Sequence, residues 1–486
     1  MPSAFAQAIF DKLFVPDGKR LVVALNRDKL LFTQDVCAKL EGTFAVQIHY
    51  GNALDLRIVR EHYIGENQDG YVLFIMNREF DLMEDIAEDV DFVNFQFRSF
   101  FPHYPWDVVK TLSFKQQEWL YEQKQYVDLD TLQTENLLRD GASEIGRKEE
   151  AFRYLQQEWA SICMKIDFNR PTEWMQRAAE ILLSAIEMDR WADFSKDVAL
   201  VNEQFLEFLQ SSYVNIVAST CGNKYPRIVT QVLPYISKQP DEKLALVVVD
   251  GMNYWQALLL TRSLEERLNV RAKYDCIYAW LPSVTELSRQ AIFRGDIPVI
   301  DYDQSPSNEG KLWKEFWSEK RVPTFQQYYQ HSGDITEEMS VKRLGYVVVD
   351  LDEKMHASDN YMYLYDATKR WVAEDEIVGN IRHLIDGGYK VYITTDHGNI
   401  ETTAYRNLDS RDKLGANRSL RHITLPKEAD KAIFEVQYEG HLVQVDSASK
   451  TYYAKEKEAF TTKERCVTHG GAHWLEVLIP FITVEK

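Results

Sequence analysis

Four short segments of the sequence place Asp and His residues beside apolar runs. Residues 244–252 (LALVVVDGM), 346–356 (YVVVDLDEKMH) and 391–399 (VYITTDHGN) each pass from an apolar stretch into Asp or His. The fourth, residues 468–473 (THGGAH), directly precedes the last apolar run. Carboxylate oxygens and imidazole nitrogens are ligands that Zn²⁺, Mn²⁺ and related divalent ions accept. The segments therefore predict a metal site, and metal-dependent hydrolysis is the chemistry that such a site supports.

The apolar runs are typical of buried strands, and side chains that follow parallel strands converge beyond the carboxyl edge of the sheet. Asp250 ends one run, and Gly251 after it allows a sharp turn, although an Asp-Gly pair is also common in plain turns. Asp352 and His356 are four residues apart and would share one face of a helix. Asp350 is near enough to serve as a ligand or to accept an imidazole N–H.

Asp396 and His397 form the sharpest pair, because adjacent residues at a strand end can each meet a different ion in a two-metal site. Seven of the eleven histidines follow Asp350, at positions 356, 383, 397, 422, 441, 469 and 473. We expect His356, His397 and His469 to be ligands. Of the others, His383 is expected on a solvated helix face, and His422 and His441 are expected to be ordinary residues of an insertion.

A candidate nucleophile lies in residues 279–295 (AWLPSVTELSRQAIFRG). Ser283 and Glu286 fit a capping box that opens a helix. Thr285 would then lie in the first turn, where free N–H groups and the helix dipole hold anions such as phosphate. A hydroxyl beside a divalent ion can lose its proton near neutral pH and become a nucleophile. The alternative is that Ser283 and Thr285 only cap the helix.

Two groups of basic residues could bind phosphate oxygens. Arg289 and Arg294 follow the candidate nucleophile and could either contact a substrate or lie on the surface. Residues 406–422 collect five basic residues, Arg406, Arg411, Lys413, Arg418 and Arg421. A charge run of this kind is usually a solvated loop, and holding a polyanionic substrate is the second interpretation.

Composition excludes several classes of protein. The chain has 486 residues, 45% of them hydrophobic, and a formal net charge of −19, so binding of nucleic acid by bulk electrostatics is not expected. Its five cysteines are scattered and form no CxxC pair, which argues against a disulfide framework and against a Cys-ligated zinc site. No signal segment and no run of about 18 apolar residues is found, which predicts a cytoplasmic protein.

The pattern of apolar residues predicts three segments. Residues 1–104 alternate strand-like and helix-like runs and are expected to form a small α/β module. Residues 105–239 have helical spacing throughout and are expected to be a helical linker or a partner-docking domain, with Trp159, Trp174 and Trp191 as packing residues. Residues 240–486 alternate strands and helices again, which predicts a largely parallel sheet with both faces covered.

Two stretches of the third segment break its rhythm, residues 301–340 and residues 401–463. Both are predicted to be insertions over the rim of the site. The second contains a β-like run, IFEVQYEGHLVQV.

The order of these motifs resembles the PglZ-domain branch of the alkaline phosphatase superfamily, found in bacterial phage-exclusion proteins. A strand with DGM is followed by LPSVTELSRQAIFRG, by D-x-x-x-H, by TDHG and by HGG before LIPFI. The resemblance covers roughly residues 243–486 and implies an alkaline-phosphatase-like α/β/α sandwich. The layout of the preceding half is also similar to the region that precedes this domain in such proteins.

The resemblance implies two divalent metal ions, with Zn²⁺ as the first expectation and Mn²⁺ as the second. One ion would be held by Asp250, Thr285, Asp396 and His397, with Thr285 as the nucleophile. The other would be held by Asp352, His356 and His469. Relatives often carry Gly where this chain has Met355, which would alter the loop around His356. His473 has no counterpart and could support the site from behind.

The expected function is that of a metal-dependent phosphodiesterase or phosphatase acting on nucleotides or nucleic acid in bacterial anti-phage defence. Other phage-defence proteins are candidate partners. A phosphothreonine intermediate would form and then be hydrolysed by water. The alternative is a non-catalytic scaffold of a multi-protein defence complex with a structural or vestigial metal site. A sulfatase is disfavoured because the sequence has neither C-x-P-S-R nor S-x-P-S-R.

Overall fold

The computed structural model describes the chain except for residues 1–2, 17, 33, 66–69, 77–83, 223, 300–301, 406–418, 426–430, 447–449 and 486. It divides into two compact units, Met1–Arg153 and Tyr154–Lys486. The boundary falls within the long helix α7 (Thr131–Cys163). This division differs from the three segments predicted from the sequence, because most of the expected helical segment belongs to the same unit as the large sheet.

The first unit contains a four-stranded parallel sheet in the order β2-β3-β1-β4. Its strands are β1 (Leu21–Asn26), β2 (Gln47–Tyr50), β3 (Val72–Met76) and β4 (Asp91–Phe95). Its helices are α1 (Ala4–Leu13), α2 (Gln34–Phe44), α3 (Ala53–Gly65), α4 (Glu84–Ala87), α5 (Trp106–Val109) and α6 (Phe114–Glu122). Strands and helices alternate in this unit, as expected for residues 1–104. The edge strand β4 gives little signal in the sequence, because DFVNF is short and has neither a continuous apolar run nor strict alternation of polar and apolar residues.

The second unit is built on a six-stranded sheet in the order β6-β16-β9-β5-β8-β7. The strands are β5 (Leu244–Val249), β6 (Arg271–Tyr278), β7 (Gln327–His331), β8 (Arg343–Val348), β9 (Lys390–Thr394) and β16 (Leu478–Glu485). β16 pairs antiparallel with both of its neighbours, and the other pairs are parallel. The predicted, largely parallel sheet is therefore confirmed.

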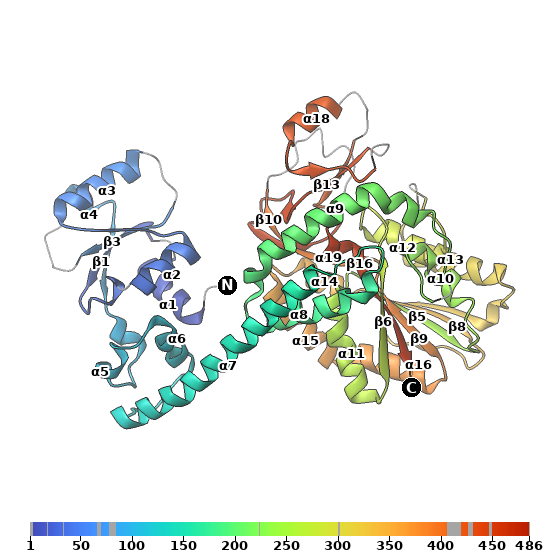
Figure 1. Cartoon of the computed structure of the whole chain (residues 1–486), viewed down its shortest axis with the longest axis horizontal. Coiled ribbons are helices and arrows are strands. Elements are labelled where there is room, and N and C mark those ends of the chain that lie inside the picture. Colours follow the sequence, from blue (N-terminus) through green and yellow to red (C-terminus); the bar gives the residue numbers. More distant parts are fainter. Residues whose placement is uncertain are drawn as a thin grey trace. The chain divides into compact units, whose positions relative to one another are not determined.

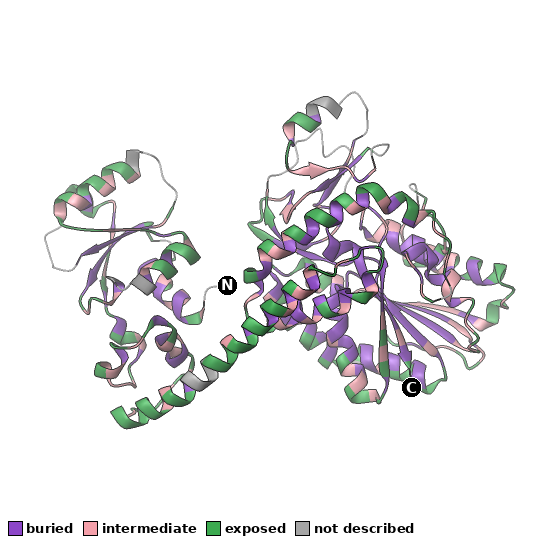
Figure 2. Ribbon diagram, viewed as in Figure 1, coloured by how far each residue is buried: buried purple, intermediate pink, exposed green. Residues whose placement is uncertain are grey.

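Helices cover both faces of this sheet (Figure 1). On one face lie α11 (Tyr254–Leu268), α15 (Tyr361–Ala373) and α16 (Asp375–Asp386), which share an apolar core with β5, β8 and β9. On the other lie α10 (Val232–Ile236), α12 (Thr285–Arg294) and α13 (Pro306–Glu319). All six residues of β5 are buried as a result, and the strands of Figure 2 are mostly purple. The unit is an α/β/α sandwich.

The predicted helices of residues 171–219 are confirmed as α8 (Met175–Glu187) and α9 (Ser195–Val217). They pack against the sandwich, where α8 contacts α11 and α15. The three tryptophans are packing residues, as expected. The rings of Trp159 and Trp174 lie 6.4 and 6.0 Å from that of Trp474, and Trp191 lies 5.0 Å from Tyr361.

The first predicted insertion, residues 301–340, is instead part of the sandwich. α13 covers the sheet, and a Cβ at Gly345 of β8 would lie 3.1 Å from the ring of Trp313 on α13. β7 extends the sheet by pairing with β8. Its sequence, QYYQH, lacks an apolar run because an edge strand is only half-buried. The pattern of apolar residues therefore does not predict a strand here.

The second predicted insertion forms two small sheets. One has the order β14-β10-β15 and the other β11-β13-β12. Their strands are β10 (Ile400–Ala404), β11 (His422–Thr424), β12 (Leu442–Val443), β13 (Thr451–Ala454), β14 (Glu458–Ala459) and β15 (Arg465–Thr468).

The β-like interpretation of IFEVQYEGHLVQV is wrong for its first part, which lies in helix α18 (Lys431–Gln437). Phe434 and Tyr438 are four residues apart, and their rings pack 4.6 Å from one another in a small apolar core. This helical spacing was the signal that an alternating pattern obscured. In the part of the chain that the structure describes, we find no helix with both the length and the hydropathy of a membrane span.

Candidate metal centre

Three carboxylates follow neighbouring parallel strands of the large sheet. β5 lies between β9 and β8, and all three strands run in the same direction. Asp250 directly follows β5, and Asp396 lies two residues beyond β9. Asp352 lies in α14 (Asp350–His356), which begins two residues beyond β8. The structure thus brings these side chains to the carboxyl edge of the sheet.

Gly251 allows the strand ends to approach one another. It has a φ of +68°, in the left-handed region that favours glycine, and a Cβ there would lie 3.1 Å from Oδ1 of Asp352. Its N–H donates to Oδ1 of Asp396 over 3.1 Å. The turn after β5 is therefore in contact with the acidic residues that follow both neighbouring strands.

The first group of candidate ligands consists of Asp352, His356 and His469, whose donor atoms all lie within 4.8 Å of one another. Asp352 and His356 share one face of α14, and Oδ1 of Asp352 lies 3.5 Å from Nε2 of His356. His469 comes from the loop after β15, and its ring lies 5.4 Å from that of His356. These three residues are the set that the resemblance assigned to one ion.

The second group consists of Asp250, Asp352 and His397, again within 4.8 Å of one another. Asp396 lies beside this group, with Oδ2 3.9 Å from Nε2 of His397. The rings of His397 and His469 stack at 3.8 Å, so the two groups adjoin. Asp352 belongs to both groups, whereas the resemblance assigned it to one ion alone.

Thr285 is the first residue of α12 and faces the second group. Its Oγ1 lies 3.0 Å from Nε2 of His397 and 3.4 Å from Oδ1 of Asp250. The predicted capping box is wrong, because the N-cap of α12 is Val284 and no side chain caps this helix. Ser283 instead donates to the carbonyl oxygen of Gly471, so the first turn of α12 retains its capacity to bind an anion.

Backbone carbonyls fix the orientation of two candidate histidine ligands. Nδ1 of His397 lies 3.0 Å from the carbonyl oxygen of Gly398, and Nδ1 of His469 lies 3.0 Å from that of Ser283. A carbonyl can only accept, so Nδ1 carries a proton in each ring, and in the neutral ring Nε2 then has a free lone pair. This is the arrangement in which proteins present histidine to a metal ion.

The centre holds more negative charge than the chain compensates. Burial and the Asp396 carboxylate raise the pKa of Asp250, and burial and Asp250 raise the pKa of Asp352. Burial alone would lower the pKa of His397, but the surrounding carboxylates outweigh it and raise this pKa.

Two buried oxygens of the centre, Oδ1 of Asp352 and Oδ2 of Asp396, accept no hydrogen bond from the residues that the structure describes. Buried polar atoms are normally satisfied, so these two call for a partner of positive charge. Hard oxygen and imidazole donors around unbalanced negative charge fit a divalent cation.

The two arginines that follow Thr285 have different places. Arg294 is exposed near the end of α12. Arg289, the weak candidate for substrate binding, is buried and donates to Asp250 and to Glu309, each over 2.7 Å. Its guanidinium is therefore engaged with carboxylates of the protein. Glu309 was not singled out from the sequence, because its partner lies on a different helix.

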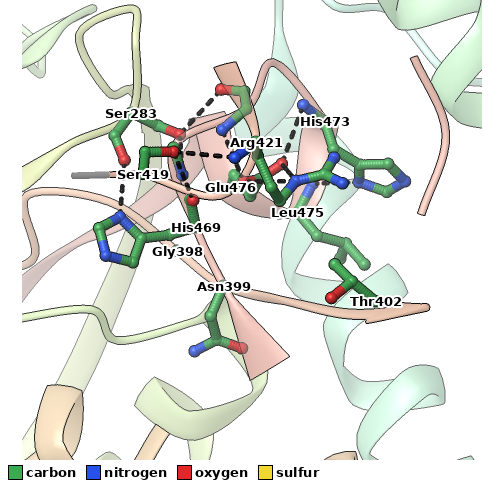
Figure 3. A network of polar contacts seen from close by, with 12 residues as sticks. Ser283, Gly398, Asn399, Thr402, Ser419, Arg421, His469, His473, Leu475 and Glu476 are labelled. Atoms are coloured by element: carbon green, nitrogen blue, oxygen red, sulfur yellow. Dashed lines mark hydrogen bonds and ion pairs between the residues drawn. The ribbon is translucent and has the colours of Figure 1, made fainter. Parts of the chain in front are cut away.

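A second buried ion pair supports the loop that carries His469 (Figure 3). Arg421 and Glu476 are both fully buried, and Nε of Arg421 lies 3.1 Å from both carboxylate oxygens of Glu476. Glu476 also accepts from the N–H of Gly471 over 2.8 Å. The sequence interpretations placed Arg421 in a solvated or substrate-binding loop. Its burial contradicts the solvated interpretation. The other four basic residues of that run lie outside the described residues.

Glycines in the two ligand loops leave room for close backbone approach. A Cβ at Gly398 would overlap the carbonyl oxygen of Leu475, and one at Gly470 would overlap the Ser419 hydroxyl. Gly470 has a φ of +102°, and a Cβ at Gly471 would lie 2.7 Å from Oε2 of Glu476. The glycines of TDHG and HGG are thus required by packing between the loops.

The other histidines that follow Asp350 belong to neither ligand group found among the described residues. His383 is half-exposed on α16 and bonds to Glu337 over 2.8 Å, as expected for a solvated helix residue. His441 bonds to Glu458 over 2.9 Å, and burial lowers the pKa of His422 to about 4. His473 caps α19 (Trp474–Val477) by accepting from the N–H of Leu475. Neither His473 nor Asp350 belongs to a ligand group found among the described residues.

Comparison with known proteins supports the resemblance drawn from the motifs. Residues 228–484, just over half of the chain, match the family described as the BREX system PglZ alkaline phosphatase-like domain. This match includes every candidate ligand and Thr285. No curated protein matches the chain.

Two solved structures are among those to which the chain is similar. Murine ectonucleotide pyrophosphatase/phosphodiesterase 5 is 11% identical, with a TM-score of 0.35 over 50% of this chain and 87% of that chain. Phosphonoacetate hydrolase from Sinorhizobium meliloti, in complex with phosphonoformate, is 12% identical, with a TM-score of 0.34 over 50% of this chain and 90% of that chain. The family match and the observed α/β/α sandwich confirm the predicted alkaline-phosphatase-like fold.

Replacing Gly398 tests the close approach behind His397. Gly398→Ala should lower the free energy of unfolding by about 1–3 kcal/mol, because the added methyl group forces two backbone segments apart. Urea unfolding of the full chain measures this change. Gly379→Ala in α16 is the matched control, since a Cβ there meets nothing within 4 Å. It should raise stability by about 0.5–1 kcal/mol, as alanine does in helices, and equal midpoints for Gly398→Ala and wild type would refute the steric argument.

Replacing Glu476 tests the buried ion pair. Glu476→Gln leaves the Arg421 charge buried without its counter-charge and should cost about 3–5 kcal/mol of unfolding free energy. The comparison is Glu242→Gln, which removes the carboxylate of an exposed pair with Lys342 and should leave the midpoint unchanged. A midpoint for Glu476→Gln as high as that of Glu242→Gln would show that the pair is dispensable.

Proposed function

Because this chain belongs to the PglZ family of alkaline phosphatase-like domains, we propose that it is a metal-dependent phosphohydrolase with Thr285 as its nucleophile. One observation carries the proposal: the Thr285 hydroxyl lies at the start of a helix, 3.0 Å from His397 and beside two groups of candidate ligands. A nucleophile, an anion site and ligands for cations then lie within one small region, as phosphoryl transfer requires.

The proposed ligand sets follow the family pattern. One ion is held by Asp250, Thr285, Asp396 and His397, and a second by Asp352, His356 and His469. Zinc is the first expectation because the sets mix carboxylate and imidazole donors, and manganese is the second. When bound, such ions would supply Lewis acidity to phosphate oxygens and lower the pKa of the Thr285 hydroxyl.

The residues of the chain have separate parts in the reaction. The Thr285 hydroxyl loses its proton to solvent as its oxygen attacks phosphorus. The new Oγ1–P bond forms, the bond from phosphorus to the leaving oxygen breaks, and the leaving group takes up a proton from solvent. The uncapped first turn of α12 holds the phosphate oxygens through backbone N–H groups and the helix dipole. Water then attacks phosphorus, which releases phosphate or its monoester and restores the Thr285 hydroxyl.

We propose a phosphodiester of a nucleotide or nucleic acid as the substrate, with a role in anti-phage defence beside other defence proteins. The family description, which names the BREX system, supports this context. The chain carries a net charge of −19, so attraction of a polyanion would depend on the ions and the helix terminus rather than on a basic surface. The proposal places the protein in the cytoplasm, where its five free cysteines are stable.

Thr285→Ala tests the nucleophile. Hydrolysis of bis(p-nitrophenyl) phosphate in the presence of Zn²⁺ or Mn²⁺ should fall on the order of 1000-fold or more, because the variant lacks the attacking hydroxyl. Thr285→Ser should retain measurable activity. Thr336→Ala removes an exposed threonine hydroxyl elsewhere and should leave the rate unchanged. Equal rates for wild type and Thr285→Ala would rule out this nucleophile, and inactivity of all forms would favour the scaffold alternative.

Metal removal tests the ligand sets. Dialysis against a chelator should abolish hydrolysis, and added Zn²⁺ or Mn²⁺ should restore it. Elemental analysis should find two ions in the wild type and one in His356→Ala, which loses one donor of a three-donor site. His383→Ala removes a histidine outside both ligand groups and should keep two ions. Full activity of the metal-free protein would contradict the proposal.

A further inference from the structure

Arg289 connects the candidate metal centre to a carboxylate behind it. It lies one helical turn after Thr285, so the two side chains share a face of α12. The Arg289 side chain is only 8% exposed and uses different nitrogens for its two partners. Nη1 donates to Oδ2 of Asp250 over 2.7 Å, and Nε donates to Oε1 of Glu309 over 2.7 Å.

The two oxygens of Asp250 face different neighbours. Oδ2 accepts from Arg289, whereas Oδ1 lies 3.4 Å from Oγ1 of Thr285 and 3.6 Å from Nε2 of His397. A carboxylate otherwise rotates about its last bond, so the arginine fixes the angle at which the other oxygen faces the ligand group. Charge-assisted hydrogen bonds of this length are strong enough to hold that orientation.

Glu309 holds the arginine from the opposite side. It projects from α13 and is fully buried. Besides Arg289, it accepts hydrogen bonds from Gln304 and from the hydroxyl of Tyr329 on β7. Its position is therefore fixed by two elements of the segment predicted to be an insertion. A buried carboxylate with three donors is satisfied, and its charge offsets that of the guanidinium.

We propose that Glu309 is a positioning residue for the metal ligand Asp250, and that it acts through Arg289. This inference rests on the proposed function, which makes Asp250 a ligand. By sharing the guanidinium, Glu309 leaves more negative charge on Asp250 for a cation and keeps Oδ1 turned toward the centre. Partners that stand behind a ligand in this way typically change metal affinity by about 10–100-fold.

The test is a titration of the full-length, metal-free protein with Mn²⁺ or Zn²⁺ in competition with a chromogenic chelator. Glu309→Gln keeps the shape of the side chain and removes its charge. The dissociation constant of the ion held by Asp250 should rise about 10–100-fold, while that of the second ion stays unchanged. The titration of His356→Ala should lack the binding step of the second ion, which shows which step of the wild-type titration belongs to that ion.

Glu337→Gln is the matched control. Its carboxylate is also largely buried, at 7% exposed, and bonds to His383 of α16 rather than to a candidate ligand or its partner. Both dissociation constants should stay at their wild-type values. Thermal unfolding of each metal-free variant is measured in parallel, because a positioning role leaves the unloaded fold nearly as stable as the wild type.

Unchanged dissociation constants in Glu309→Gln would overturn the inference. An equal rise in both constants with a lowered unfolding midpoint would also overturn it, since that pattern marks a general structural role. A wild-type protein that binds neither ion would overturn the proposed function. A wild-type protein that binds both ions, beside unchanged constants in Glu309→Gln, would overturn only the role of Glu309. If Glu309→Gln does not fold, Glu309→Asp keeps the charge but withdraws it from Arg289 by one methylene. The first constant should then rise alone, and an unchanged value would overturn the inference.

Discussion

Repulsion among Asp250, Asp352 and Asp396 is the constraint on which the second unit depends. Like charges brought together with little water between them repel strongly, since the interior screens them less than bulk solvent. The backbone N–H groups of Gly251 and His397 and the guanidinium of Arg289 offset part of this charge. The strands and helices around the centre must supply the rest of the restraint, and they do so by packing rather than by neutralising charge.

The sequence predicts those parts of the centre whose signal is local. An apolar run of six residues ending at Asp250 is a buried strand because both faces of the sheet are covered, and the same reasoning placed Asp396 and His397. Helical spacing placed His356 on the same face of α14 as Asp352.

The supporting residues could not be predicted in this way, because their partners are far away in the sequence. Arg289 and Glu309 meet only when α12 packs on α13, and Arg421 finds Glu476 across 55 residues. A charged residue that will be buried has the same local pattern as one that will be solvated. Only the tertiary fold distinguishes them. The wrong predictions for β7 and α18 have local causes instead: the edge strand lacks an apolar run, and an alternating pattern obscures the helical spacing of α18.

Residues that precede the region matching the family also help to hold the candidate metal centre in place. α9 precedes that region, yet the Asn202 side chain on α9 accepts from the N–H of Trp474 over 3.3 Å and donates to the carbonyl of Lys455 over 2.8 Å. Trp159 and Trp174 also pack against Trp474, directly after the HGGAH segment. Helices that lie outside the matched region thus pack against the segment that follows the His469 loop.

Because of the position of β16 in the sheet, the candidate metal centre is complete only after this strand has paired with its neighbours. It is the last strand of the large sheet in sequence, yet it lies between β6 and β9, and Phe481 pairs with both Asp275 and Thr394. Contacts of such large sequence separation form late, because closing a long loop costs entropy before the contacts repay it. The loop with His469 leads into β16, so a partly folded chain has both a gap in its sheet and an incomplete ligand set. The candidate metal centre is therefore completed late in folding, when the last strand of the chain enters the middle of the sheet.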